Sequence, residues 1–169
     1  MEFKKIQLNG FKSFAEKTTF IIDDGLTGIV GPNGCGKSNI VESLRWCMGE
    51  TSAKSMRGSG MEDVIFSGTS NKPSKNIAEV IINITNESKD GPIQYKNLEN
   101  IEIKRKIEKD KGSKFYINEK EVRAKDAQMF FADLSTGAHS PSIISQGRIG
   151  ALVTAKPTDR RAVLEEAAG

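Results

Sequence analysis

The residues with the clearest chemistry form one glycine-rich run, Gly31-Pro32-Asn33-Gly34-Cys35-Gly36-Lys37-Ser38, followed by Asn39. The run fits the pattern G-x-x-x-x-G-K-[ST], in which glycines let backbone N–H groups turn inward around the phosphates of a nucleotide. In this pattern Lys37 reaches the β- and γ-phosphates, and the hydroxyl of Ser38 binds Mg²⁺. The alternative interpretation is a glycine-rich turn that matches by chance.

Two elements must flank such a loop, and the sequence supplies both. Residues 26–30, Leu-Thr-Gly-Ile-Val, are typical of a short buried strand that leads into the loop. Downstream, apolar residues recur at helical spacing, at Ile40, Val41, Leu44 and Met48. We therefore expect a helix that begins at the loop, directs its positive dipole end at the phosphates and ends near Gly49.

The rest of the chain is dominated by strand patterns that come in consecutive pairs. Alternating or β-branched residues predict strands at 4–11, 18–22, 77–85, 101–107 and 114–118. A helix is predicted at 124–134, with one face formed by Ala127, Phe130, Phe131 and Leu134, and a last helix begins near Pro157. Strand pairs without regular βαβ alternation favour an antiparallel β subdomain laid over a small α/β core, an α/β fold with α+β character.

The connections and the charged runs complete this outline. Residues 50–76 read as loop, interrupted by the apolar Val64-Ile65-Phe66, and residues 86–100 read as an exposed turn. The strand at 101–107 is expected to have a charged outer face, and Lys104-Arg105-Lys106 reads as that face plus its neighbours. Cys47 falls on the buried side of its helix as a small apolar residue.

The composition is that of an ordinary globular domain, with 169 residues of which 37% are hydrophobic and 28% charged. A net charge of +3 is weak support for an anionic partner. We expect no membrane contact, because no apolar run is long enough to cross a bilayer and the N-terminus has no signal-peptide pattern. The two cysteines do not suggest a disulfide framework, and Cys35 lies inside the phosphate loop, so a cytoplasmic location is expected.

A complete nucleotide hydrolase of this kind needs an aspartate after an apolar strand to hold Mg²⁺. Two residues have the right local pattern: Asp23 lies upstream of the phosphate loop, and Asp133 lies on a helical pattern. Neither fits well. The sequence therefore predicts half of a catalytic site, with the other half on another segment or protomer.

Four motifs occur in order along the whole chain. They are Phe11-Lys12-Ser13-Phe14, the phosphate loop through Asn39, Ile144-Ser145-Gln146-Gly147-Arg148, and Arg160-Arg161 to Glu165-Glu166-Ala167-Ala168-Gly169. Together they resemble the N-terminal half of the head domain of a bacterial SMC (structural maintenance of chromosomes) ATPase. The resemblance implies a P-loop NTPase of the ABC type, and residues 1–169 would be one lobe of its head, with coiled-coil entry from about residue 158.

In this family the C-terminal half of the same head carries the Mg²⁺ aspartate, the catalytic glutamate and the signature motif. The isolated chain is therefore expected to be nearly inactive. The resemblance further implies that two heads of a homodimer sandwich two ATP molecules with Mg²⁺. It implies double-stranded DNA and kleisin-type subunits as partners, association with the nucleoid, and a role in chromosome condensation and segregation.

The resemblance also assigns roles to individual residues. The expected ATP contacts are Lys12, Pro32, Asn33, Gly34, Cys35, Gly36, Lys37, Ser38, Asn39, Asp63, Ile65 and Gln146, with Asp63 and Ile65 acting through their backbone. Catalysis is assigned to Lys37, Gln146 and Arg57, of which Arg57 would be an arginine finger, and Mg²⁺ binding to Ser38 and Gln146. The candidates for DNA contact are Arg123, Lys125, Lys72 and Lys75.

Plainer interpretations stand beside these assignments. Lys12, Arg57 and Gln146 could be solvated residues of a strand end or a loop, and the DNA candidates could belong to an ordinary charged surface. Glu119 stands where relatives often have a glycine, so the turn after Asn118 can differ. Two other functions remain open, a related ABC-type ATPase of DNA double-strand-break repair and a nucleotide-binding module without turnover.

Overall fold

The structure is a computed structural model, and it describes residues 2–22, 37–51, 60–86 and 93–133. The strands are β1 (Glu2–Asn9), β2 (Thr18–Ile21), β3 (Ile77–Thr85), β4 (Asn100–Glu108), β5 (Gly112–Ile117) and β6 (Lys120–Val122). The helices are α1 (Lys37–Cys47) and α2 (Ala124–Asp133), and two short 3₁₀ turns are η2 (Met61–Val64) and η3 (Ile93–Tyr95). The predicted strand at 26–30 and the helix near 157 lie outside the described residues.

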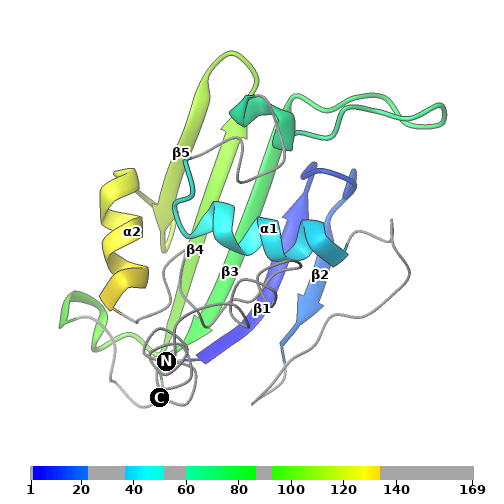
Figure 1. The fold of residues 1–169 in the computed structure, drawn as a ribbon. Coiled ribbons are helices and arrows are strands. Elements are labelled where there is room, and N and C mark those ends of the chain that lie inside the picture. The colour runs from blue at the N-terminus through cyan, green and yellow to red at the C-terminus, as the bar shows by residue number, and fades with distance from the viewer. Residues whose placement is uncertain (1, 23–36, 52–59, 87–92, 134–169) are drawn as a thin grey trace, which may run out of the picture.

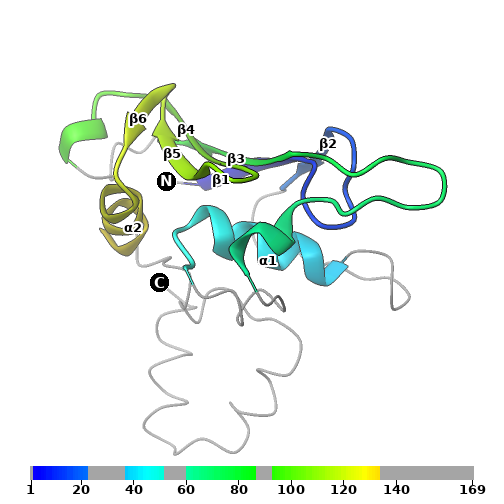
Figure 2. The ribbon, with the colours of Figure 1, turned by 90° about the horizontal axis from the view of Figure 1, so that it is seen from above.

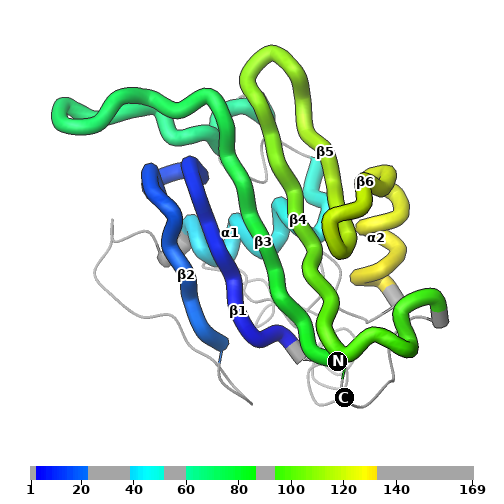
Figure 3. The backbone as a smooth tube through the Cα atoms, turned by 180° about the vertical axis from the view of Figure 1, so that it is seen from behind, coloured from blue at the N-terminus to red at the C-terminus, as the bar shows by residue number. Residues whose placement is uncertain are grey.

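The six strands form one sheet in the order β2-β1-β3-β4-β5-β6, and each neighbouring pair is antiparallel (Figure 3). Four neighbouring pairs are also consecutive in the chain. The exception is the pairing of β1 with β3, which sets Ile6 opposite Ile82 and so closes a long stretch of sequence. That stretch contains α1, and the helix is thereby brought back over the sheet.

Both helices cover the same face of the sheet (Figures 1 and 2). Alternation explains which face, because side chains of a strand point to opposite sides in turn. In β3 and β4 the buried positions alternate along the strand, and they hold mainly isoleucine and valine. The core is built from these side chains together with Trp46, Met48, Phe130 and Phe131 of the helical layer.

Arg105 lies on the buried face of β4 and not on the charged outer face expected from the sequence. The alternation puts Lys104 and Lys106 outside, but it puts Arg105 on the inner face with Ile103 and Ile107, where only 3% of the residue is exposed. From the sequence, the run of three basic residues is interpreted as the outer face of the strand plus its neighbours. The period of two separates its members onto opposite faces of the sheet.

In the segment before β4, residues 94 and 96–99 are exposed, as the sequence predicts, but Asn86 is buried and Tyr95 is half-buried. Asn86 is fully buried; its backbone N–H donates to the Glu99 carbonyl (2.7 Å) and its side-chain amide donates to the Tyr95 carbonyl (3.1 Å). The ring of Tyr95, in η3, meets Phe130 of α2 edge to face at 5.5 Å between centroids. Asn86 and Tyr95 therefore anchor a connection whose residues 94 and 96–99 are exposed.

The strand β6 was not predicted, and it exists because of a tight turn. Asn118 and Glu119 both have positive φ, 49° and 66°, the signature of a two-residue hairpin turn. Asparagine adopts this conformation readily, and the Asn118 Oδ1 accepts from the Glu102 N–H at 2.8 Å. Glu119 therefore occupies the position where a glycine would be free of strain, while its carboxylate lies 3.1 Å from the Lys104 Nζ.

Candidate nucleotide-binding site

The helix α1 begins at Lys37, near the end of the glycine-rich run, as the sequence predicts. Lys37 and Ser38 thus form the start of its first turn, where backbone N–H groups have no partner within the helix and the dipole is positive. That arrangement favours an anion such as a phosphate. Outside the described residues lie Arg57, Gln146, Pro32, Asn33, Gly34, Cys35 and Gly36.

The other end of α1 is tied to the sheet and to α2. The Arg105 guanidinium donates to the carbonyl oxygens of Trp46 (2.8 Å) and Glu50 (2.6 Å), and the Gln128 amide donates to the Gly49 carbonyl (2.9 Å). These carbonyls belong to the last turn of the helix or follow it, where a cation also complements the helix dipole. These contacts fix the C-terminal end of α1 against the sheet and α2, and thereby the direction of the helix.

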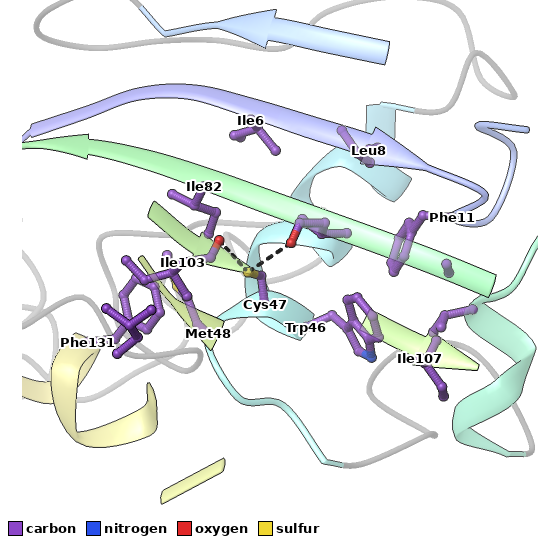
Figure 4. Packing of buried hydrophobic residues seen from close by; sticks show 14 of the residues in the cluster. Ile6, Leu8, Phe11, Trp46, Cys47, Met48, Ile82, Ile103, Ile107 and Phe131 are labelled. Atoms are coloured by element: carbon purple, nitrogen blue, oxygen red, sulfur yellow. Dashed lines mark hydrogen bonds between the residues drawn. The ribbon is translucent and has the colours of Figure 1, made fainter. Parts of the chain in front are cut away.

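The last residue of α1, Cys47, lies in the core between the helix and the sheet (Figure 4). Its thiol is close enough to donate weak hydrogen bonds to the carbonyl oxygens of Val80 (3.6 Å) and Ile103 (3.7 Å). Complete burial raises the pKa of Cys47 to about 12, with Arg105 opposing that rise. The residue is a neutral structural thiol, as the sequence predicts.

The loop of residues 10–14 lies against the first turns of α1. The Asn39 amide donates to the Ser13 hydroxyl at 2.9 Å, and the Lys12 Nζ lies 3.5 Å from the Glu42 Oε2. The side chains of Lys12 and Glu42 are only 13% and 10% exposed. Lys12 is therefore not a solvated lysine at a strand end.

A second segment fixes this loop from its other side. The Lys12 N–H donates to the Val64 carbonyl at 2.6 Å, and the Phe66 N–H donates to the Gly10 carbonyl at 2.7 Å. Lys12 itself has a φ of 50°, in the left-handed region that a lysine rarely adopts. The backbone of Lys12 is thus held in an unusual conformation by Val64, the last residue of η2.

Asp63 and Ile65 belong to this second segment, and their contacts within the protein restrict how each could bind a ligand. The Asp63 Oδ2 accepts from the Gly60 N–H at 3.0 Å and so closes the turn η2. Ile65 pairs with Phe11 in an isolated β-bridge and is 6% exposed, so its side chain belongs to the core. Any contact of Ile65 with a ligand would therefore pass through its backbone.

Four predicted site residues, Lys12, Asn39, Asp63 and Ile65, lie on three segments that are joined through Ser13, Val64 and Phe11, and these segments form one cluster. Sequence reasoning missed Glu42, which joins this cluster through Lys12. Its signal was present: Glu42 follows Asn39 by three residues, a spacing that places both side chains on one face of the helix.

The DNA candidates Arg123 and Lys125 lie at the start of α2. The Arg123 guanidinium makes a two-pronged contact with Asp126, with Nε to Oδ2 and Nη2 to Oδ1 both at 3.0 Å. This hydrogen bonding lowers the pKa of Asp126, whose Oδ2 also accepts from the Arg123 N–H and caps the helix. Arg123 remains 81% exposed at its side chain, so it can still meet a large anionic surface.

Lys72 and Lys75 lie elsewhere, in the segment that leads into β3. The Lys72 Nζ is 3.5 Å from the Glu16 Oε1, and both lysines are exposed. No described contact joins them to Arg123 or Lys125, so the structure does not gather the four into one patch within the described ranges. In the same part of the chain, no group of three or more His, Cys, Asp or Glu side chains could hold a metal ion, and neither helix is long and apolar enough to cross a membrane.

Comparison with known proteins gives consistent matches along the chain. The profile of the RecF/RecN/SMC N terminal domain family matches residues 2–147. The "Chromosome partition protein Smc" of Cereibacter sphaeroides is 54% identical over all 169 residues, and that of Rhodopseudomonas palustris is 53% identical. The chain spans about 15% of the length of these two relatives.

Solved structures agree with this result. One comes from work on ATP-driven dimerization and DNA-stimulated activation of SMC ATPases; it has a TM-score of 0.84 and 30% identity, and the match covers 98% of this chain and 99% of that one. An Smc head bound to the C-winged helix domain of ScpA has a TM-score of 0.86 and 31% identity, with 98% of this chain and 50% of that chain covered. This chain therefore belongs to the RecF/RecN/SMC family and corresponds to the N-terminal part of an SMC head domain.

Proposed function

We propose that this chain is the ATP-binding half of an SMC head, and that residues 1–169 form the N-terminal lobe. With a C-terminal half it forms an ABC-type ATPase, whose ATP-dependent head engagement drives DNA binding, chromosome condensation and segregation. The observation that carries the proposal is the start of α1 at Lys37, near the end of the glycine-rich run, with the loop of residues 10–14 lying against the first turns of the helix.

The described residues suit the phosphates of a nucleotide. The first turn of α1 offers backbone N–H groups to phosphate oxygens, and the Lys12 ammonium, paired with Glu42, lies beside the helix. In the proposed site Lys37 holds the β- and γ-phosphates, Ser38 and Gln146 hold Mg²⁺, and Arg57 reaches phosphate as an arginine finger. Bound Mg²⁺ would neutralise charge that develops on the phosphates during transfer.

The partners follow from the family. The proposed partners are the C-terminal half of the same head, a second protomer, double-stranded DNA and a kleisin-type subunit. The solved Smc head with ScpA supports the last of these, and the SMC ATPase with ATP-driven dimerization supports the second. Exposed Arg123 and Lys125 suit contacts to DNA backbone phosphates, which need no sequence reading. The corresponding location is the cytoplasm, at the nucleoid.

Turnover measurements test this proposal. ATP hydrolysis is measured for the chain alone and after mixing with the C-terminal head half, with and without double-stranded DNA. Turnover should appear only on mixing, increase with DNA and vanish in Lys37→Ala. The exposed Lys96 offers a matched control, and Lys96→Ala should leave turnover unchanged.

Other results would decide against parts of the proposal. Hydrolysis by the chain alone that is lost in Lys37→Ala would place the Mg²⁺ aspartate within this chain. Binding of ATP without hydrolysis in the mixture would favour a nucleotide-binding module. Stimulation by DNA ends in preference to closed circles would favour the break-repair ATPase.

A further inference from the structure

Glu42 is an acidic residue in an unusual place. It lies in the second turn of α1, between the buried residues Ile40 and Ser43, and only 8% of it is exposed. A carboxylate in such surroundings loses its water and needs a compensating charge. The Lys12 Nζ, 3.5 Å from the Glu42 Oε2, provides that charge.

The pair is part of a two-point contact between α1 and the loop of residues 10–14. Asn39 and Glu42 are three residues apart on one helix face, and they contact the consecutive loop residues Ser13 and Lys12. The opposite side of the loop is fixed by the Lys12 N–H, which donates to the Val64 carbonyl. The backbone and the ammonium group of Lys12 are thus restrained independently, from two different elements.

We propose that Glu42 is a positioning residue for nucleotide binding: it holds the Lys12 ammonium beside the first turns of α1, in the direction of the nucleotide phosphates. This inference rests on the proposed function, in which Lys12 contacts ATP. A lysine side chain that is free to rotate loses rotamer entropy when a ligand fixes it in one position. Glu42 removes much of that freedom before ATP arrives, and pre-ordering of this kind strengthens binding.

Two electrostatic effects of Glu42 oppose each other, and the geometry decides between them. The carboxylate repels phosphate, which would weaken ATP binding. The low exposure of the pair means that solvent screens it poorly, so the attraction that holds Lys12 in place is strong, and repulsion by the neutral pair as a whole is small. Positioning therefore dominates, and loss of the Glu42 charge weakens binding.

The test is a double-mutant cycle in the full-length protein that contains this chain, with the Kd for Mg-ATP as the readout. Glu42→Gln should weaken binding by about tenfold. Lys12→Met should weaken it at least as much, and Glu42→Gln should add less than twofold in the Lys12→Met background. As a matched control, Glu119→Gln removes a carboxylate that pairs with Lys104 on the outer face of the sheet, and it should leave the Kd unchanged.

A charge swap separates positioning from a purely structural ion pair. Compared with the single variants Lys12→Glu and Glu42→Lys, the double variant Lys12→Glu with Glu42→Lys should have a melting temperature closer to that of the unaltered protein. Its Kd for Mg-ATP should stay as weak as in the single variants. If Glu42→Gln fails to fold, Glu42→Asp keeps the charge with a shorter reach and should weaken ATP binding by about threefold.

The inference is overturned if Glu42→Gln leaves the Kd within twofold or tightens binding, or if its effect is equal in both backgrounds. Recovery of ATP binding in the charge swap, or an unchanged Kd in Glu42→Asp, would overturn it as well. Lys37→Ala distinguishes the two proposals. If that variant still binds ATP normally, the proposed function fails, whereas loss of binding in Lys37→Ala with a normal Glu42→Gln contradicts only the role of Glu42.

Discussion

Arg105 connects the centre of the sheet to the end of α1. Its guanidinium lies 4.6 Å from the ring centroids of both Trp46 and Phe115, and it donates to two carbonyls at the helix end and to the Ser113 hydroxyl. Burial lowers the pKa of Arg105 to about 10, so the group stays charged at neutral pH. Only the planar, forked donor of arginine can stack and bridge in this way.

Replacement of Arg105 should therefore destabilise the fold. Arg105→Met leaves the carbonyls of Trp46 and Glu50 without their donor, and we expect a loss of about 3 kcal/mol in the free energy of unfolding, measured with urea. Arg105→Lys should recover less than half of this loss, because a lysine cannot reach two carbonyls and stack at once. Lys106→Met, one residue away on the outer face, is the control and should change stability by less than about 0.5 kcal/mol. Equal effects at both positions would refute this role for Arg105.

At the scale of elements, the loop of residues 10–14 is the junction of the candidate site. It lies between α1, the segment after η2 and the start of β3, and its path depends on Gly10. This residue has a φ of 67°, and a Cβ there would collide with the backbone carbonyl oxygen of Ile77. The close approach of two backbones lets the loop turn from β1 toward α1 and carry Lys12 with it.

Gly10→Ala should consequently disturb both stability and the site. We expect a loss of about 2 to 4 kcal/mol, measured by thermal unfolding, because left-handed strain is added to a collision with backbone. Alanine variants of two other glycines separate the effect of the left-handed conformation from the effect of the collision. Gly112→Ala, with a φ of 79° and open space around its Cβ, should lose about 1 kcal/mol, and Gly60→Ala, which has neither feature, should lose almost nothing. A loss at Gly10 no greater than that at Gly112 would show that the backbone contact is unimportant.

At the scale of the whole molecule, the sheet and its helical layer enclose Cys47 completely (Figure 4). The thiol has an ordinary pKa of 9.0, and burial in the folded protein raises it to about 12. Ionisation of Cys47 is therefore coupled to the opening of the entire helix and sheet packing. The unfolded chain loses this proton at a lower pH than the folded chain does.

The coupling predicts an alkaline loss of stability. Stability from this group is fully present below pH 9 and is lost as the pH rises from 9 toward about 12, with a slope of at most about 1.4 kcal/mol per pH unit. Urea unfolding of Cys35→Ser and of Cys35→Ser with Cys47→Ala, compared from pH 7 to pH 11, isolates the effect. The stability difference between the two variants should shrink above pH 9, and a constant difference would mean that the thiol ionises alike in both states.

Short-range patterns in the sequence determined most of the elements. The glycine-rich run predicted a helix that begins at the loop, and alternating or β-branched residues predicted the five strands β1 to β5 to within a few residues, because helix starts and strand faces follow from local spacing. The burial of Arg105 was not predicted, because a run of three basic residues suggested an outer face and its neighbours. Local chemistry could not reveal β6, since it depends on Glu119 in a conformation that glycine usually adopts.

Only the tertiary structure decided which distant residues meet. The pairing of β1 with β3 joins segments separated by α1, and it brings Lys12 to Glu42 and to Val64. No periodicity in the chain encodes these contacts, because they depend on how the sheet closes over its helix and on the volume that each buried side chain fills. The sequence thus determined the phosphate-binding pattern and the buried faces of most helices and strands. Packing decided that the buried Glu42 carboxylate lies beside Lys12 of the adjoining loop.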